Sequence, residues 1–78
     1  MDVRIPKMGM STVEVDISEV YVRNGQQVAI GDPLVRVEAE KASFDLEAES
    51  VGIVRDLAVA EGDVRNVGDV ICRLEEMT

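Results

Sequence analysis

The stretch VYVRNGQQVAIGDPLVRVE, residues 20–38, returns 37 positions later as LAVAEGDVRNVGDVICRLE, residues 57–75. In both copies Val-x-x-Gly is followed, after five residues, by Gly-Asp and a segment ending in Arg, an apolar residue and Glu. Such a repeat indicates one supersecondary unit used twice. We expect each unit to form a short sheet whose apolar face the other covers, giving an all-β flattened barrel or sandwich with pseudo-two-fold symmetry. The units run roughly over 17–38 and 54–75 of a single domain, residues 1–78.

Short segments of alternating hydrophobicity support this prediction. Residues 13–17, 34–38 and 70–75 alternate apolar and polar side chains, as strands with one buried face do. Residues 51–60 are rich in β-branched side chains and are also predicted to be a strand. The glycines that repeat with the pattern suit turns with positive φ, and their spacing matches no phosphate-binding loop. They are Gly25, Gly31, Gly62 and Gly68.

The composition excludes several classes of function. With no histidine and one cysteine, Cys72, the chain can hold no Ser-His-Asp triad and effectively no zinc site of histidine and cysteine ligands. A net charge of −8 and only two aromatic residues make nucleic acid a poor partner. No apolar run approaches the ~20 residues that cross a bilayer. We therefore expect no catalytic residue, no metal and no membrane partner, and we expect Cys72 in the core of a protein from a reducing compartment.

Residues 34–48 are predicted to form two strands joined by a tight turn near residues 40–42. One face of each strand is apolar and the other is polar. The apolar positions are Val35, Val37, Ala39, Phe44, Leu46 and Ala48. The turn therefore carries Lys41 at a tip that projects from one end of the molecule, between the two repeat units.

Lys41 suits an attachment point better than it suits a catalytic amine. Schiff-base chemistry requires a lysine whose pKa is depressed by burial or by a cationic neighbour. Here the neighbours include Glu38 and Glu40, and carboxylates stabilise the ammonium form. We therefore interpret Lys41 as a side chain to which another enzyme attaches a group.

These residues resemble the lipoyl domains of the acyltransferase components of 2-oxoacid dehydrogenase complexes, in the biotinyl/lipoyl attachment family. The segment Glu38-Ala39-Glu40-Lys41-Ala42 resembles the family's Glu-Thr-Asp-Lys-Ala motif, with glutamate in place of the usual aspartate. Gly25, 16 residues before Lys41, and Gly52, 11 residues after it, match the family's spacing. The resemblance implies two four-stranded antiparallel sheets and lipoylation of Lys41. The residues it suggests for recognition during modification are Glu38, Glu40, Ala42, Gly25 and Gly52.

The resemblance also implies a function. Lys41 would carry amide-linked lipoate as a swinging arm that shuttles acyl groups and reducing equivalents, in a domain that is itself no enzyme. The implied partners are a lipoate ligase or lipoyl transferase, a thiamine-diphosphate-dependent decarboxylase, an acyltransferase core and a dihydrolipoyl dehydrogenase. We expect the domain to be monomeric and cytoplasmic, or in the mitochondrial matrix if its source is eukaryotic.

Two alternatives remain open from the sequence. Biotinyl domains usually present their lysine as Ala-Met-Lys-Met, whereas Lys41 is flanked by Glu40 and Ala42, which favours lipoate over biotin. A biotin carboxyl carrier domain is still one alternative. The other is an unmodified lipoyl-like interaction module.

Overall fold

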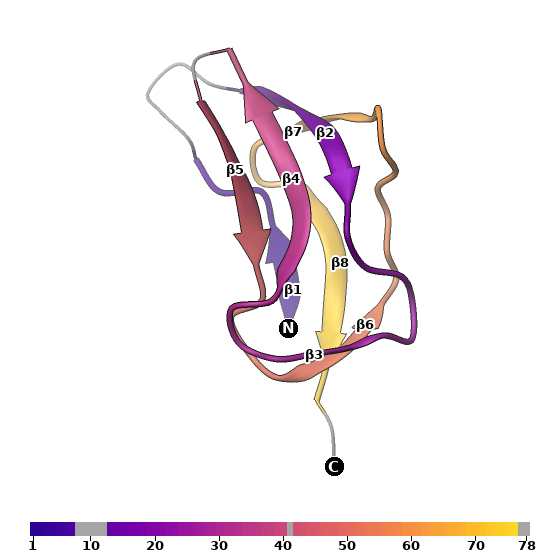
Figure 1. The fold of residues 1–78 in the computed structure, drawn as a ribbon. Coiled ribbons are helices and arrows are strands. Elements are labelled where there is room, and N and C mark those ends of the chain that lie inside the picture. The colour runs from indigo at the N-terminus through magenta and orange to yellow at the C-terminus, as the bar shows by residue number, and fades with distance from the viewer. Residues whose placement is uncertain (8–12, 41, 77–78) are drawn as a thin grey trace.

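The computed structural model describes residues 1–7, 13–40 and 42–76, and its regular elements are strands. Figure 1 shows their arrangement. In chain order they are β1 (Asp2–Arg4), β2 (Glu14–Val20), β3 (Gln27–Val28), β4 (Pro33–Ala39), β5 (Ala42–Glu47), β6 (Gly52–Arg55), β7 (Val64–Asn66) and β8 (Val70–Glu75). Within these residues there is no helix with the length and apolar character needed to cross a membrane.

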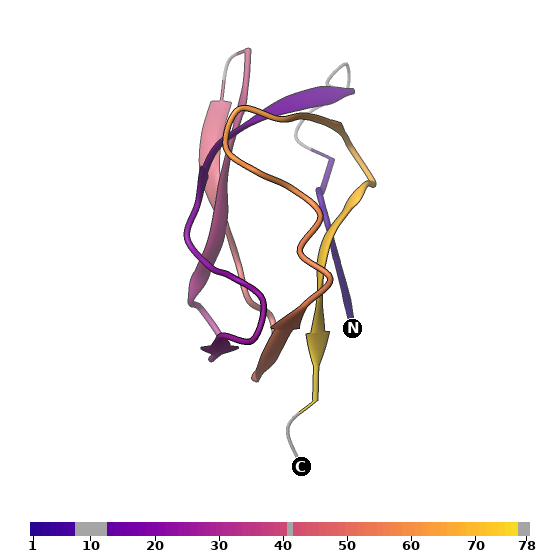
Figure 2. The same ribbon diagram turned by 90° about the vertical axis from the view of Figure 1, so that its right-hand side faces the viewer.

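The strands form two four-stranded antiparallel sheets, in the orders β1-β8-β6-β3 and β5-β4-β2-β7. The two sheets face each other as layers, as the side view in Figure 2 shows. The predicted all-β sandwich is therefore confirmed. The prediction that each repeat unit forms its own sheet is wrong, because each sheet contains two strands from β1–β4 and two from β5–β8.

Exchanged hydrogen bonds explain this mixing. The Gly25 amide donates to the Val54 carbonyl at 2.8 Å, and the Gly62 amide donates to the Ile17 carbonyl at 2.8 Å. Gly62 lies 37 residues after Gly25, and Val54 lies 37 residues after Ile17. Each unit thus places its turn on a strand of the other, which satisfies backbone groups that would otherwise be buried without partners.

The repeated glycines have the backbone conformation that their positions predict. Their φ angles are +90° at Gly25, +93° at Gly31, +92° at Gly62 and +95° at Gly68. A Cβ atom built at any of the four would meet no atom within 4 Å. Glycine is therefore required at these turns by φ and not by lack of space.

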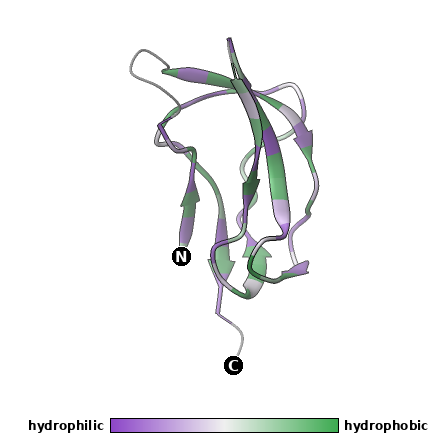
Figure 3. Ribbon diagram, turned by 60° about the vertical axis from the view of Figure 1, so that its left-hand side comes forward, coloured by the Kyte–Doolittle hydropathy of each residue, from purple (hydrophilic) through white to green (hydrophobic). Residues whose placement is uncertain are grey.

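The core lies between the sheets and is almost entirely aliphatic. Figure 3 shows hydrophobic and hydrophilic residues alternating along the strands, which is how each sheet directs one face inward. The most deeply buried side chains are Ile5, Val15, Ile17, Val28, Leu34, Val35, Val37, Val54, Ile71 and Cys72. Cys72 is fully buried, as predicted, and burial raises the pKa of its thiol.

The predicted strands agree with the structure except in one segment. Residues 70–75 coincide with β8, 34–38 lie within β4, and 13–17 overlap β2. The strand expected over 51–60 is wrong beyond Arg55, where β6 ends and Asp56 adopts a φ of 53°. After this bend the Leu57 amide donates to Asn24 Oδ1 at 2.9 Å and the Ala58 amide donates to the Ile71 carbonyl at 2.8 Å. The residues after Arg55 therefore form a loop, and from this loop Val59 is buried in the core.

Candidate functional site

The hairpin of β4 and β5 forms one end of the molecule, opposite the end where β3 and β6 lie (Figure 1). Its register pairs Val37 with Phe44, Glu38 with Ser43 and Ala39 with Ala42. Only two residues, 40 and 41, connect the last pair. The predicted hairpin and the position of its turn are therefore confirmed. Lys41 itself lies outside the described residues.

The hairpin is fixed to the core through one face. Val37 is fully buried and Leu46 is 7% exposed, while Phe44 and Ala39 are half-buried and pack against the core cluster. The residues at the tip, Glu40 and Ala42, are exposed. The hairpin therefore holds its tip in solvent on an anchored base, as a site for covalent attachment requires.

An ion pair and hydrogen bonds stiffen the outer face of the same hairpin. Arg36 Nη1 lies 3.4 Å from Asp45 Oδ1, and Arg36 Nη2 donates to Ser43 Oγ at 3.1 Å. The Tyr21 hydroxyl donates to the same Asp45 oxygen at 3.0 Å. Partial burial, together with the hydrogen bond to Asp45, raises the pKa of the Tyr21 phenol. This network joins β4, β5 and the residue after β2, and the sequence did not predict it.

The surface beside the tip is acidic. A shallow hollow of about 490 Å³ lies there, and its lining residues are Asp16, Glu38, Ala39, Glu40, Ala42 and Ser43. Asp16 on β2 is the cross-strand partner of Glu38 on β4, and both are exposed. Neither forms an ion pair with any described residue. Like charges directly opposite each other destabilise a sheet. The repulsion between Asp16 and Glu38 is therefore expected to lower the stability of the fold.

Asp16 was missed by the sequence reasoning. Its alternation within 13–17 indicates an outward side chain, but not the strand beside it. The neighbour depends on the register of β2 against β4, which shifts between Ile17 and Glu19. A bulge of this kind has no clear signal in the local sequence.

The structure brings together three of the five residues proposed for recognition and separates the other two. Glu38, Glu40 and Ala42 lie at the tip, whereas Gly25 and Gly52 lie toward the opposite end, near β3 and β6. Gly52 pairs with Val28, and a Cβ at Gly52 would lie 2.8 Å from the Glu75 carbonyl oxygen. The geometry thus accounts for both glycines through the fold, one by its φ and the other by close strand packing.

The described residues contain no group of three or more His, Cys, Asp or Glu side chains placed to hold a metal ion. What the tip offers is room for a covalently attached group, since the positions on both sides of residue 41 are exposed and the adjoining hollow is open to solvent. The chain has two lysines. Lys7 is exposed and follows β1, outside the turn of this hairpin.

Comparison with known proteins shows similarity to the biotinyl/lipoyl family. The biotinyl/lipoyl family model, described as "Biotin-requiring enzyme", matches residues 1–74. The chain is 30% identical over 74 residues to the dihydrolipoyllysine-residue acetyltransferase component of the pyruvate dehydrogenase complex of Pseudomonas aeruginosa, covering 95% of this chain and 13% of that protein. It is 31% identical over 71 residues to the lipoamide acyltransferase component of the branched-chain α-keto acid dehydrogenase complex of Bacillus subtilis, covering 91% and 17%. The chain therefore spans less than a fifth of these relatives.

A solved structure shares the fold. The lipoyl domain of the 2-oxoglutarate dehydrogenase complex from Azotobacter vinelandii superposes with a TM-score of 0.81 at 22% identity. The match covers 97% of this chain and 96% of that domain. The two sheets are therefore those of the lipoyl-domain fold.

Proposed function

Because the chain belongs to the biotinyl/lipoyl attachment family, we propose that it is a lipoyl carrier domain in which Lys41 bears lipoate in amide linkage. The observation that carries the proposal is the β4–β5 hairpin, whose two-residue connection contains Lys41 between exposed Glu40 and Ala42. When attached, the dithiolane of lipoate supplies the acyl-carrying and redox chemistry. The domain acts as a carrier and leaves catalysis to its partners.

The chain's own residues would present the lysine. The buried face of the hairpin anchors it through Val37 and Leu46, and the Arg36–Asp45 ion pair braces its outer face. The tip then supports a long arm at a fixed point of a small domain. Tethering replaces the free diffusion of a small thiol by a local effective concentration that can reach the mM range.

The acidic surface beside the tip gives the carrier a means of choosing its partners. Asp16, Glu38 and Glu40 create a negative region there, and amide formation at Lys41 removes one positive charge, taking the net charge from −8 to −9. We therefore expect the partners to approach with basic rims, at rates that fall as salt rises. The partners that we propose are a lipoate ligase or lipoyl transferase, a thiamine-diphosphate-dependent decarboxylase, an acyltransferase core and a dihydrolipoyl dehydrogenase.

A biotin carrier is the second candidate, because the matching family includes biotin-requiring enzymes. Expression of the chain with lipoate ligase and with biotin ligase, each with its ligand, distinguishes the two by intact mass. We expect one lipoyl addition to the unaltered chain and none from biotin ligase.

The two lysines provide matched controls for this experiment. Lys41→Arg should abolish the addition, because arginine lacks the amine that forms the amide, and Lys7→Arg should leave the addition complete. Both variants keep the positive charge, so a change of charge cannot explain a difference between them. A biotinyl addition, or a lipoyl addition that survives Lys41→Arg, would contradict the proposal.

A further inference from the structure

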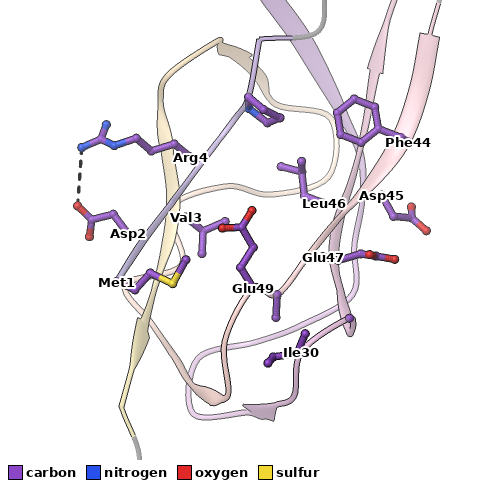
Figure 4. Close-up of a pocket in the computed structure, with 13 residues that line it drawn as sticks. Met1, Asp2, Val3, Arg4, Ile30, Phe44, Asp45, Leu46, Glu47 and Glu49 are labelled. Carbon is purple, nitrogen blue, oxygen red and sulfur yellow. Dashed lines mark ion pairs between the residues drawn. The ribbon is translucent and has the colours of Figure 1, made fainter.

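A groove separates β1 from β5 along one side of the sandwich. These are the end strands of the two sheets, and neither pairs with the other. The groove has a volume of about 580 Å³ and extends from Phe44 down to Met1 and Ile30 (Figure 4). Pro6 also lines it. The carrier function proposed above uses the hairpin tip and gives this groove no role.

The floor of the groove is apolar, and its far end exposes large side chains. Val3 from β1 and Leu46 from β5 extend into it (Figure 4). At the end away from the hairpin tip, Met1 is 53% exposed on one wall and Ile30 is 70% exposed on the other. Ser50 is close to Met1, with its hydroxyl 3.3 Å from Met1 Sδ, and the next residue in the chain, Val51, is 49% exposed. Exposed apolar surface concentrated in this way marks an interaction site.

The available charge on the groove is negative. Arg4, the basic residue of the lining, is already paired with Asp2 at 3.7 Å and donates to the Gly68 carbonyl at 2.9 Å. In contrast, Glu47 and Glu49 form no ion pair within the described part of the chain. Figure 4 shows the Glu49 carboxylate over the apolar floor, between Val3 and Leu46. A cation placed there would meet a carboxylate in partly apolar surroundings, where charge pairing is stronger than in open solvent.

The backbone on both walls can accept an extended chain. Among the described residues, β1 pairs only with β8 and β5 pairs only with β4, so within this part of the chain each strand has one unpaired edge facing the groove. An exposed strand edge carries N–H and C=O groups that a further strand can pair with. A volume of this size is within the range of established ligand sites and accommodates a segment of a few residues.

We propose that the groove between β1 and β5 binds an extended segment of a partner protein in which lysine or arginine alternates with aliphatic residues. The free strand edges select an extended backbone. The apolar floor, with Met1 and Ile30 at its end, selects the aliphatic side chains. Glu49 selects the cations, because its carboxylate lies over the groove and lacks an ion-pair partner among the described residues (Figure 4).

The test is a titration of the isotopically labelled 78-residue chain, carrying Lys41→Arg, with a capped peptide of alternating valine and lysine, followed by NMR. Using the Lys41→Arg variant separates this proposal from lipoylation, so either can fail without the other. We expect saturable shifts of amides in β1, β5 and the residues near Ile30. Shifts confined to other strands, or equal shifts with a valine–glutamate peptide, would overturn the proposal.

Surface variants with matched controls sharpen the test. Glu49→Lys should weaken binding of the valine–lysine peptide about fivefold, because it replaces attraction by repulsion, whereas Glu61→Lys, an exposed site outside the groove, should not. Ile30→Ser should also weaken binding, and Val64→Ser, on β7, should not. Equal effects of a variant and its control would overturn the proposal. So would shifts of the groove amides that grow with protein concentration without peptide, since a second copy would then be the occupant.

Discussion

Glu38 and Glu75 occupy the same position in the two repeat units, yet their surroundings differ. Glu75 on β8 pairs with Arg55 at 3.4 Å and with Arg73 at 3.7 Å. Glu38 on β4 faces Asp16 across the sheet and has no ion pair among the residues that the structure describes. The fold thus neutralises the carboxylate in one sheet and leaves its counterpart free beside the hairpin tip.

The cause lies in two positions of the neighbouring strands. Where β6 has Ile53 opposite Glu75, β2 has Asp16 opposite Glu38. Where β6 has Arg55, β2 has Ser18, 37 residues earlier, whose hydroxyl bonds to the Arg36 carbonyl instead. The repeat therefore keeps the pairs Asp16–Glu38 and Ile53–Glu75 in equivalent register and changes their side chains, whereas the register shift at Ser18 in β2 has no counterpart at Arg55 in β6. The repeated fold therefore does not require an unpaired carboxylate at this position, in agreement with the docking role proposed for Glu38.

The largest effect on stability is expected from releasing the hairpin from the core. Phe44→Ala should lower the free energy of unfolding by about 2–3 kcal/mol, less than for a fully buried phenylalanine because Phe44 is half-buried. Chemical denaturation measures this loss. Val64→Ala, at an exposed position of β7, serves as control and should change the free energy little. An equal loss in both variants would mean that Phe44 does not anchor the hairpin.

The next effect breaks the packing of the other sheet. Gly52→Ala should lower the free energy of unfolding by about 1–3 kcal/mol, because its Cβ would lie 2.8 Å from a backbone oxygen of Glu75. The equivalent position in the first unit is Val15, where the core accommodates a buried side chain. Denaturant melts of Gly52→Ala and Val15→Ala compare the two sites. A neutral Gly52→Ala would show that β6 and β8 can separate at no cost.

Replacing Glu38 and Glu75 by glutamine tests whether the two carboxylates affect stability in opposite directions. Glu38→Gln should raise the free energy of unfolding by about 0.5 kcal/mol by removing repulsion from Asp16. Glu75→Gln should lower it by a similar amount, because two exposed ion pairs are lost. Thermal melts at low salt measure both, and the difference should shrink at high salt. If the free energy of unfolding changed with the same sign in both variants, Glu38 and Glu75 would not differ in their effect on stability.

The smallest effect on stability, and the sharpest on docking, is expected from Ser18→Arg. This change copies Arg55 into β2 and supplies a cation near Glu38. Stability should change by less than about 0.5 kcal/mol, whereas the salt dependence of the rate at which a basic partner associates should become weaker. Stopped-flow measurements at two ionic strengths give this dependence. An unchanged salt dependence would show that the charge of Glu38 does not contribute to docking.

The sequence predicts the parts of this fold that depend on local pattern. The hairpin alternates apolar and polar side chains over 35–40 and 43–48, and Gly25 and Gly62 repeat a turn that requires positive φ. The distribution of strands between sheets was not predictable, because a repeat shows that two units are related but not which strands share hydrogen bonds. β3 has two residues and β7 has three, too few for a periodic signal.

The candidate site divides in the same way. The alternation on both sides of residues 40–42 predicts the hairpin and therefore places Glu38, Glu40 and Ala42 near its tip, as the register of β4 and β5 confirms. Asp16 depends on a register shift in β2, and the Arg36–Asp45–Tyr21 network depends on contacts between three segments. Only their spacing from Lys41 associates Gly25 and Gly52 with the site in the sequence, and the structure places both toward the other end of the molecule.

We propose that the hairpin between the two repeat units presents Lys41 for lipoylation, and peptide mapping of the protein purified from its own source is the decisive experiment. Proteolysis and tandem mass spectrometry of the peptide containing residues 38–42 identify the group and the atom that carries it. We predict a lipoyl group in amide linkage at Lys41 and an unmodified Lys7. An unmodified Lys41, or a biotinyl group on it, would show that this chain is not a lipoyl carrier.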